Sequence, residues 1–264
     1  MNRIASKFAQ LQSQGRKALI PFVTAGDPAL QATVPVMHAL VVAGADVIEL
    51  GVPFSDPMAD GPTIQRSSER ALARGAGLRY VLDAVRDFRR QDATTPVVLM
   101  GYLNPVEIHG SEKFAQEAST AGVDGLLLVD LPPEEAGESR AIFNAHGLDL
   151  IALASPTTGD DRLARLCAEA QGYLYYVSFA GVTGASDRLD TSAASKRLAT
   201  IRAQSKVPVV AGFGIKDAVS AKAMSHDADG VVVGSALVEA LAQSSDPVAT
   251  AKQFLSPLRN ALDG

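Results

Sequence analysis

Three acidic residues follow closely on one another where an apolar run gives way to a loop. Glu49 lies in the middle of the run, and Asp56 and Asp60 follow in a loop that is rich in proline and glycine. Strand alternation puts Glu49 on the face opposite the bulky Ile48 and Leu50, so its carboxyl should point away from any covering helix. A buried carboxyl without a basic partner has a raised pKa, which suits a group that gives and takes protons near neutral pH.

The alternative for Glu49 is an ion pair inside the fold, because buried carboxylates are usually paired. None of the apolar runs contains Lys or Arg, so no strand offers such a partner. Asp60 is either a second carboxylate of the same site, in a wetter setting, or a turn residue that hydrogen-bonds its own backbone. Two acids in different environments can divide acid and base roles. We expect Asp56 to be more exposed and able to contact a partner.

Two later apolar runs both end in glycine, just before a segment that can begin a helix. The first ends at Gly212 and continues through Phe213 and Gly214, and the second continues through Gly234 and Ser235. Backbone amides at a helix N-terminus bind anions, and bare glycines let a phosphate approach closely. The sequence therefore predicts a phosphate site at these two ends.

Other residues at the ends of the apolar runs complete a pocket. The glycine-rich stretch 178–186 has the composition of a mobile lid, from which Thr183 and Gly184 are placed to reach phosphate oxygens. The remaining side chains are Phe22, Met100, Tyr102, Leu127, Val129, Leu153, Tyr175 and Phe213. Each alone is explained by core packing. Together they describe an apolar, partly aromatic pocket for a flat ring on a phosphorylated tail.

Eight apolar runs, separated by segments with helical periodicity, must position these residues. They cover residues 18–24, 47–51, 96–102, 125–129, 149–154, 173–178, 207–212 and 230–234. Runs that are apolar throughout are typical of parallel strands covered on both faces. The pattern predicts an α/β fold, a (β/α)8 TIM barrel in a single domain over residues 1–264, with an extra N-terminal helix at 3–14. An open doubly wound sheet is the alternative, but the first run lacks the Gly-x-Gly-x-x-Gly turn.

Composition narrows the classes of function. The net charge is -5 with Lys and Arg scattered, so there is no basic surface for nucleic acid or an anionic membrane. No apolar run has membrane length and no leader is evident, which predicts a cytoplasmic protein with a small-molecule substrate. The one cysteine, Cys167, lies in a helix-like pattern and is expected to be an inert core thiol. The histidines lack metal-ligand spacing and no Lys lies in a strand, so neither a metal site nor a Schiff base is expected.

Longer motifs extend over nearly the whole chain. They are ALIPFVTAGDP at 18–28, ELGVPFSDP at 49–57, ADGP at 59–62, MGY at 100–102 with Asn104 and Pro105, DLPPEE at 130–135, GVTG at 181–184, GFG at 212–214, and Gly234 with Ser235. Together they resemble the tryptophan synthase alpha chain family. The resemblance implies a lyase that cleaves indole-3-glycerol phosphate by a retro-aldol reaction to indole and glyceraldehyde 3-phosphate. It also implies an α2β2 complex in which a beta chain carries pyridoxal phosphate and receives the indole through a tunnel, so no cofactor is expected on this chain.

The resemblance also implies roles for individual residues. Glu49 would protonate the ring carbon that bears the glycerol chain and take the proton from the neighbouring hydroxyl. Asp60 would hold the indole N–H and stabilise the positive charge of the protonated ring, while Asp56 would lie at the interface with the beta chain. Tyr175 would stand on the substrate side as a third catalytic residue. The substrate-binding set would be Phe22, Met100, Tyr102, Leu127, Thr183, Gly184, Phe213, Gly214, Gly234 and Ser235.

The residues leave two other functions open. One is another phosphosugar-processing barrel of amino-acid biosynthesis, such as a ketose isomerase, whose substrate would have no indole ring. The other is a duplicated barrel that is retained only as a non-catalytic activator of a beta chain.

Overall fold

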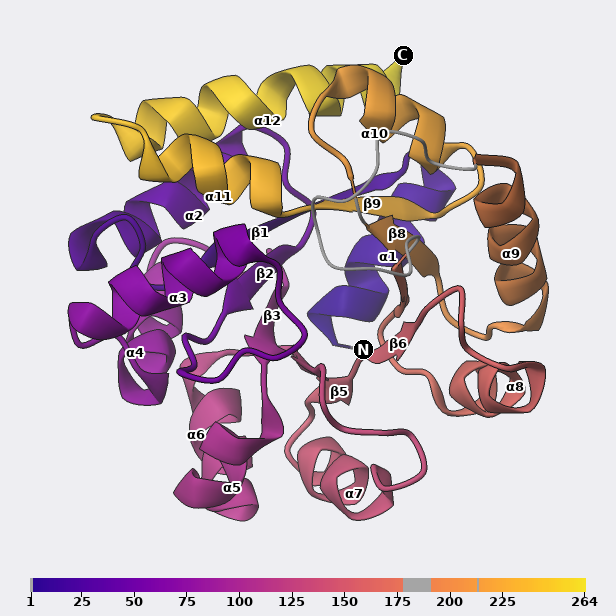
Figure 1. Cartoon of the computed structure of the whole chain (residues 1–264), viewed down its shortest axis with the longest axis horizontal. Helices are drawn as coiled ribbons and strands as arrows, with labels where there is room; N and C mark the ends of the chain where they lie inside the picture. The colour runs from indigo at the N-terminus through magenta and orange to yellow at the C-terminus, as the bar shows by residue number, and fades with distance from the viewer. Residues whose placement is uncertain (1, 178–190, 213) are drawn as a thin grey trace.

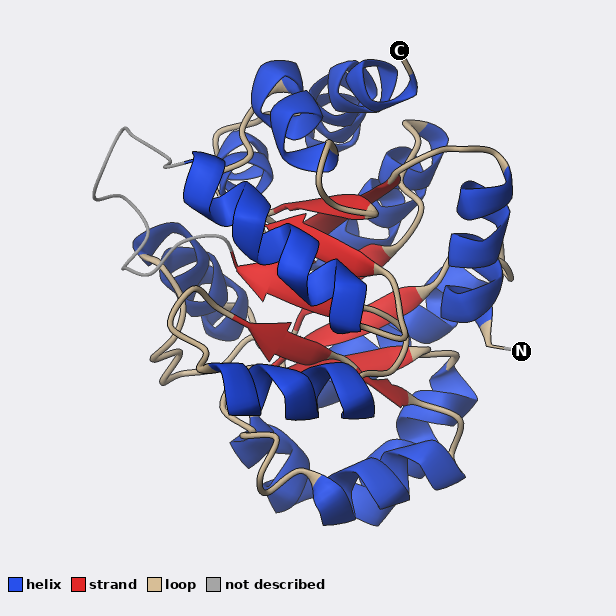
Figure 2. Ribbon diagram, turned by 90° about the vertical axis from the view of Figure 1, so that its right-hand side faces the viewer, coloured by secondary structure: helices blue, strands red, loops and turns tan. Residues whose placement is uncertain are grey.

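The predicted TIM barrel is confirmed by the architecture of the computed structural model. It describes residues 2–177, 191–212 and 214–264, and only the backbone of 191–194. Seen down its axis, the chain forms a ring of strands inside a ring of helices (Figure 1). From the side, the strands lie in the centre with helices around them (Figure 2). Among the described helices, none combines the length and the apolar character that crossing a membrane requires.

Parallel strands form one closed sheet. The described strands are β1 (Ala18–Thr24), β2 (Ile48–Gly51), β3 (Val97–Gly101), β4 (Gly125–Leu128), β5 (Asp149–Leu150), β6 (Ala152–Ala154), β7 (Leu174–Val177), β8 (Val209–Gly212) and β9 (Gly230–Val233). Their order is β5-β4-β3-β2-β1-β9-β8-β7-β6. The two end strands are separated in sequence by Ile151 alone, so the sheet closes on itself.

The predicted fifth strand, 149–154, is the one run that the structure divides. Its first part pairs with β4 and its second part with β7, so the strand changes partner at Ile151. The Ile151 N–H donates to the Leu126 carbonyl at 2.8 Å. The prediction of one continuous strand was therefore wrong in detail, because closing the ring requires this strand to serve two neighbours in succession.

The strand register gives the stagger of the barrel. Phe22 on β1 leads through successive partners to Asp149 on β5. In the other direction, Ala18 on β1 leads to Leu153 on β6. Phe22 and Ala18 are four residues apart on β1, and Asp149 and Leu153 are four residues apart on the fifth strand. The total stagger around the barrel is therefore eight residues. This is the value of a (β/α)8 barrel, and it fixes which side chains share the interior.

Helices cover the outer face of the sheet. They are α1 (Arg3–Ser13), the 3-10 turn η1 (Leu30–Ala32), α2 (Thr33–Val42), α3 (Pro62–Ala73), α4 (Leu78–Arg89), α5 (Leu103–His109), α6 (Ser111–Ala121), α7 (Gly137–Ala145), α8 (Asp160–Glu169), α9 (Thr191–Gln204), α10 (Ala218–Ser225), α11 (Ser235–Ala242) and α12 (Pro247–Asp263). The predicted N-terminal helix is α1. Two helices follow each of β2, β3 and β9, where the sequence pattern suggested one connection.

The first helix closes one end of the barrel. Its buried residues Ile4, Phe8 and Leu11 recur at helical spacing and pack into the cluster that fills the barrel interior. The Phe8 ring lies 5.8 Å from the Tyr173 ring, measured between centroids. Because this end is filled, a site inside the barrel can open only at the opposite end, where the strands finish.

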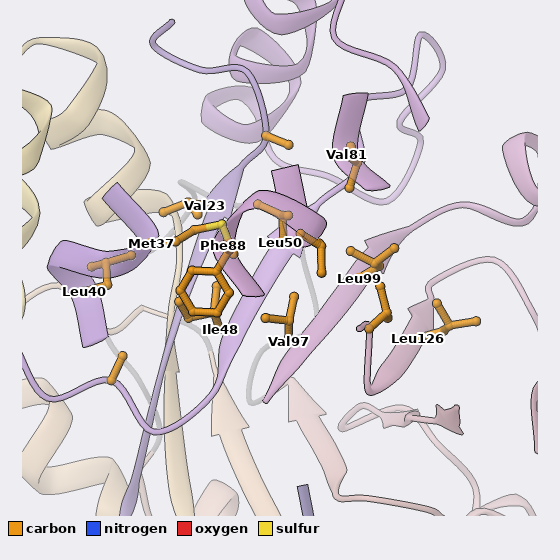
Figure 3. Close-up of a cluster of buried hydrophobic side chains, with 14 of the residues drawn as sticks. Val23, Met37, Leu40, Ile48, Leu50, Val81, Phe88, Val97, Leu99 and Leu126 are labelled. Carbon is orange, nitrogen blue, oxygen red and sulfur yellow. The ribbon is translucent and has the colours of Figure 1, made fainter. Parts of the chain in front are cut away.

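The outer layer of the core explains the orientation of β2. Ile48 and Leu50 point into a cluster with Met37 of α2 and Phe88 of α4, between the strands and the helices (Figure 3). Since side chains alternate along a strand, Glu49 must point to the barrel interior. The predicted orientation of this carboxyl is confirmed.

Carboxylates at the closed end tie neighbouring strands together. Each aspartate accepts a hydrogen bond from a backbone N–H at the start of the preceding strand. The pairs are Asp46 with Leu19, Asp124 with Val97 and Asp229 with Val209, at 2.9–3.0 Å. An arginine also binds each of the three: Arg259, Arg89 and Arg202 respectively. These three carboxylates are thus paired with arginines and serve stability.

Replacing Asp124 with alanine should destabilise the barrel strongly. The carboxylate binds Arg3 at 2.9 Å and Arg89 at 2.7 Å, and the Arg89 side chain is only 10% exposed. Its loss leaves a nearly buried cation unpaired, so we expect urea titration to show a loss of about 3–5 kcal/mol in the free energy of unfolding. Asp83→Ala, which removes an exposed pair with Arg86, should cost less than about 1 kcal/mol. Equal losses in the two variants would contradict this view.

Candidate active site

Glu49 is a fully buried acid near the open end of the barrel. Its Oε1 accepts a hydrogen bond from the Tyr173 hydroxyl at 2.6 Å. Its Oε2 has no hydrogen-bond partner among the described residues. Burial raises the pKa of Glu49 to about 7, an effect that the bond from Tyr173 partly opposes. Both protonation states are therefore populated near neutral pH.

Tyr173 was not among the residues predicted from the sequence. Glu49 forms no ion pair with any described residue, in keeping with the lack of Lys and Arg in the strands. One of its oxygens instead accepts a hydrogen bond from the neutral phenol of Tyr173. Tyr173 lies just before β7 and two positions before Tyr175, on the same strand face. That spacing of two was the signal that could have found it.

Tyr175 occupies a place that only a glycine neighbour permits. Its hydroxyl lies against Gly212 of β8, where an added Cβ would stand 2.1 Å from the oxygen. Burial raises the pKa of Tyr175, and the nearby Glu49 carboxyl adds to the rise. The hydroxyl thus stays protonated and is available as a hydrogen-bond donor.

A hollow lies at the open end of the barrel. Its lining residues are Phe22, Thr24, Gly51, Val52, Asp60, Ile64, Ser68, Met100, Gly101, Tyr102 and Val129. Ile64 and Ser68 are four residues apart on α3, which a search of strand ends does not cover. These two residues and Thr24 were not predicted from the sequence. Glu49 does not line the hollow. Gly51, which follows it on the same strand face, does, so the carboxyl lies one level deeper.

Asp60 forms the wall of this hollow opposite the strands' apolar residues and is half-buried. Burial raises the pKa of Asp60 to about 6, and a hydrogen bond with the Tyr102 hydroxyl opposes the rise. Its carboxylate therefore interacts with another element, and no bond to its own turn is described. Asp60 is more exposed than Glu49 and has the lower pKa of the two.

Asp56 and Met58, at the tip of the acidic loop, point into solvent. Asp56 is exposed and its carboxylate accepts a hydrogen bond from the Ser55 hydroxyl. Met58, nearby at the tip, is 84% exposed. An exposed methionine beside an exposed carboxylate offers both an apolar and a charged contact to another protein.

The two glycine ends lead into turns at the same end of the barrel. Gly214 has a φ of 70°, a conformation that favours glycine. Gly234 stands directly before α11, Ser235 is its first residue, and no described side chain caps the helix. Its first N–H groups are thus available to an anion.

Other predicted contacts are placed less directly. Leu127 is buried in the cluster inside the barrel and does not line the hollow. Gly234 lies beside Phe22: a Cβ added to Gly234 would stand 3.6 Å from the Cβ of Phe22. Thr183, Gly184 and Phe213 lie outside the described residues, as does the predicted lid. Across the described chain, His, Cys, Asp and Glu side chains form no group of three or more suited to a metal ion.

Comparisons with known proteins agree with one another. The family model for the tryptophan synthase alpha chain matches residues 8–261. The tryptophan synthase alpha chain of Xanthomonas axonopodis pv. citri (strain 306) is 74% identical over 266 residues, which cover 100% of this chain and 99% of that protein. That of Xanthomonas campestris pv. campestris (strain B100) is 73% identical and covers 99% and 97%.

Solved structures show the same likeness. Tryptophan synthase subunit alpha from Legionella pneumophila str. Paris superposes with a TM-score of 0.94 at 47% identity and covers 100% of this chain and 99% of that one. The tryptophan synthase from M. tuberculosis in its aminoacrylate-bound form gives a TM-score of 0.88 at 35% identity, with coverage of 99% and 100%.

The raised pKa of Glu49 predicts how a substitution changes stability with pH. Folding raises the pKa of Glu49 from its ordinary value of 4.5 to about 7, so folding favours the protonated form and the wild-type protein loses stability as pH rises through this window. Glu49→Gln cannot ionise, so at pH 8 it should be more stable than wild type by on the order of 3 kcal/mol, an advantage that shrinks toward pH 4.5. Urea titrations across pH measure this. The exposed Glu138→Gln should show no such trend, and a pH-independent difference for Glu49→Gln would contradict the assignment.

Proposed function

This chain belongs to the tryptophan synthase alpha chain family, and from that premise we propose how its barrel mouth cleaves indole-3-glycerol phosphate into indole and glyceraldehyde 3-phosphate. The enzyme is a carbon–carbon lyase. The observation that carries the residue assignment is Glu49: a buried carboxyl with a pKa of about 7, with one oxygen that has no hydrogen-bond partner among the described residues, below an apolar hollow.

Glu49 acts as acid and then as base. In its protonated form it delivers a proton to the ring carbon that bears the glycerol chain, and it becomes a carboxylate. The carboxylate then takes the proton of the adjacent hydroxyl as the carbon–carbon bond breaks, which leaves an aldehyde and neutral indole. A pKa near 7 suits both steps. Because Glu49 lies below the hollow, its carboxyl must turn from Tyr173 toward the mouth to reach the ring.

Asp60 supplies fixed negative charge. Its pKa of about 6 keeps it mostly ionised at neutral pH, when Glu49 is still partly protonated. An ionised carboxylate at the edge of the hollow binds the indole N–H and stabilises the positive charge that C-protonation places on the ring. The reaction thus requires Asp60 to be ionised and Glu49 to begin protonated, which sets the two limbs of its pH dependence.

The remaining residues hold the substrate. Phe22, Met100 and Tyr102 form the walls for the ring, with Leu127 and Phe213 further contacts. Tyr175 stands near the reacting chain as a hydrogen-bond donor. The phosphate binds at the start of α11 beside Gly234 and Ser235. We assign Gly214, Thr183 and Gly184 as further substrate contacts. Strands from both halves of the chain close one barrel, which supports treating residues 1–264 as a single domain.

The exposed acidic loop supports a protein partner. We assign Asp56 to an interface with a tryptophan synthase beta chain in an α2β2 complex, with the apolar Met58 beside it. The pyridoxal phosphate of the complex belongs to that beta chain. The buried free thiol of Cys167 suits a reducing, cytoplasmic location.

Indole formation by the purified chain tests this function. Wild type should release indole from indole-3-glycerol phosphate, and faster with a beta chain added. Glu49→Gln should release none at the limit of detection yet still bind the substrate, because it loses the proton shuttle but keeps the pocket. Asp60→Asn should retain at most about one hundredth of the rate, since the charge opposite the ring nitrogen is lost.

Each result bears on a different part of the assignment. Near-normal turnover by Glu49→Gln would refute the proton shuttle, and a full rate in Asp60→Asn would remove that residue from the site. A barrel that acts on other phosphosugars would form no indole and would turn over a substrate without the ring.

A further inference from the structure

Tyr102 lies where the ring pocket, the acidic loop and Asp60 meet. Resting on the proposed function, we infer that Tyr102 is a positioning residue for Asp60, and that it couples Asp60 to the exposed loop 53–59 on which a partner would sit. This role goes beyond that of a wall for the ring. It rests on three separate contacts of one buried side chain, which is 4% exposed.

The hydroxyl of Tyr102 interacts with both the loop and Asp60. Its oxygen accepts a hydrogen bond from the Ala59 N–H at 3.1 Å. Tyr102 and Asp60 line the same hollow, and the interaction of the hydroxyl with the Asp60 carboxylate lowers the pKa of Asp60. A phenol has one proton to donate and can still accept. A carboxylate can only accept, so the proton goes to Asp60 and a lone pair receives the amide of the preceding residue. One atom thereby fixes both the loop backbone and the catalytic carboxylate.

The ring of Tyr102 makes the second link. It packs against the Phe54 ring with centroids 5.2 Å apart and planes inclined at 31°. Phe54 and Ala59 lie near the two ends of the loop that carries the exposed Asp56 and Met58. A displacement of the loop at either end would therefore change a contact of Tyr102.

The loop has few other ties to the barrel. The described hydrogen bonds of residues 53–59 stay within residues 53–60, such as Met58 N–H to Asp56 O and Asp60 N–H to Pro57 O, or go to Tyr102. Tyr102 itself is anchored firmly. It directly follows β3, and the next residue, Leu103, donates its N–H to Asp130 Oδ1 at 2.8 Å. When the loop moves, the backbone at Tyr102 therefore stays in place.

Charges around Tyr102 keep it in the donor form. Burial and then the Asp60 charge raise the pKa of Tyr102, and Asp130 adds to the effect. The hydroxyl remains protonated across the working range and stabilises the ionised form of Asp60. Removing it should therefore raise the pKa of Asp60 above its present value of about 6. The low-pH limb of activity would move to higher pH.

The test is Tyr102→Phe, which keeps the ring and removes the hydroxyl. Indole formation is measured across pH for wild type and variant, with and without a tryptophan synthase beta chain as the partner probe. We expect kcat to fall about tenfold with a smaller change in KM. The low-pH limb should shift upward, and the beta chain should accelerate the variant less than wild type. Phe54→Leu, which keeps the hydroxyl, should weaken only the response to the beta chain.

Tyr80→Phe is the matched control. It removes a hydroxyl that binds Leu30 O at 2.6 Å and Thr33 Oγ1 at 2.7 Å, away from the hollow, and should leave the pH profile unchanged. An unmoved low-pH limb in Tyr102→Phe would overturn the positioning role, even if the rate falls. Equal acceleration of wild type and Tyr102→Phe by the beta chain would overturn the coupling. Failure of wild type to form indole would instead refute the proposed function.

Discussion

The burial of one carboxyl group, with no cation beside it among the described residues, governs the site of this barrel. Glu49 has no exposed surface, and its described partner is the Tyr173 phenol. A phenol stabilises a carboxylate less than a cation does, so desolvation prevails and the pKa rises to about 7. The apolar strands that create this environment also exclude competing bases. The chemistry therefore depends on the apolar surroundings of Glu49 as much as on the carboxyl itself.

The two ends of the barrel use the same residue types in opposite ways. At the closed end, Asp46, Asp124 and Asp229 each bind an arginine and a backbone N–H, so they hold strands together. At the open end, Glu49 and Asp60 have hydroxyl partners in place of arginines, and burial raises the pKa of Glu49 to about 7 and that of Asp60 to about 6. Helix α1 fills the closed end up to Tyr173. Stability and reactivity are thereby separated along the barrel axis.

Much of this arrangement could be predicted from the sequence, because apolar runs reveal strands and alternation reveals their faces. The orientation of Glu49 followed from Ile48 and Leu50 alone. The division of the fifth strand did not, since the change of partner at Ile151 is a property of ring closure and leaves no local pattern. Tyr173 could have been found from its spacing to Tyr175. Ile64 and Ser68 enter the hollow because of how α3 packs, which a strand-based reading does not contain.

Glu49 is held near its point of half-ionisation at neutral pH. Carbon-13 NMR of the chain labelled at glutamate side-chain carboxyls measures this directly, with the Glu49→Gln spectrum identifying the signal. We expect a titration midpoint near 7 for Glu49, whereas exposed glutamates in proteins titrate near about 4.3. A midpoint for Glu49 among those of the exposed glutamates would contradict it.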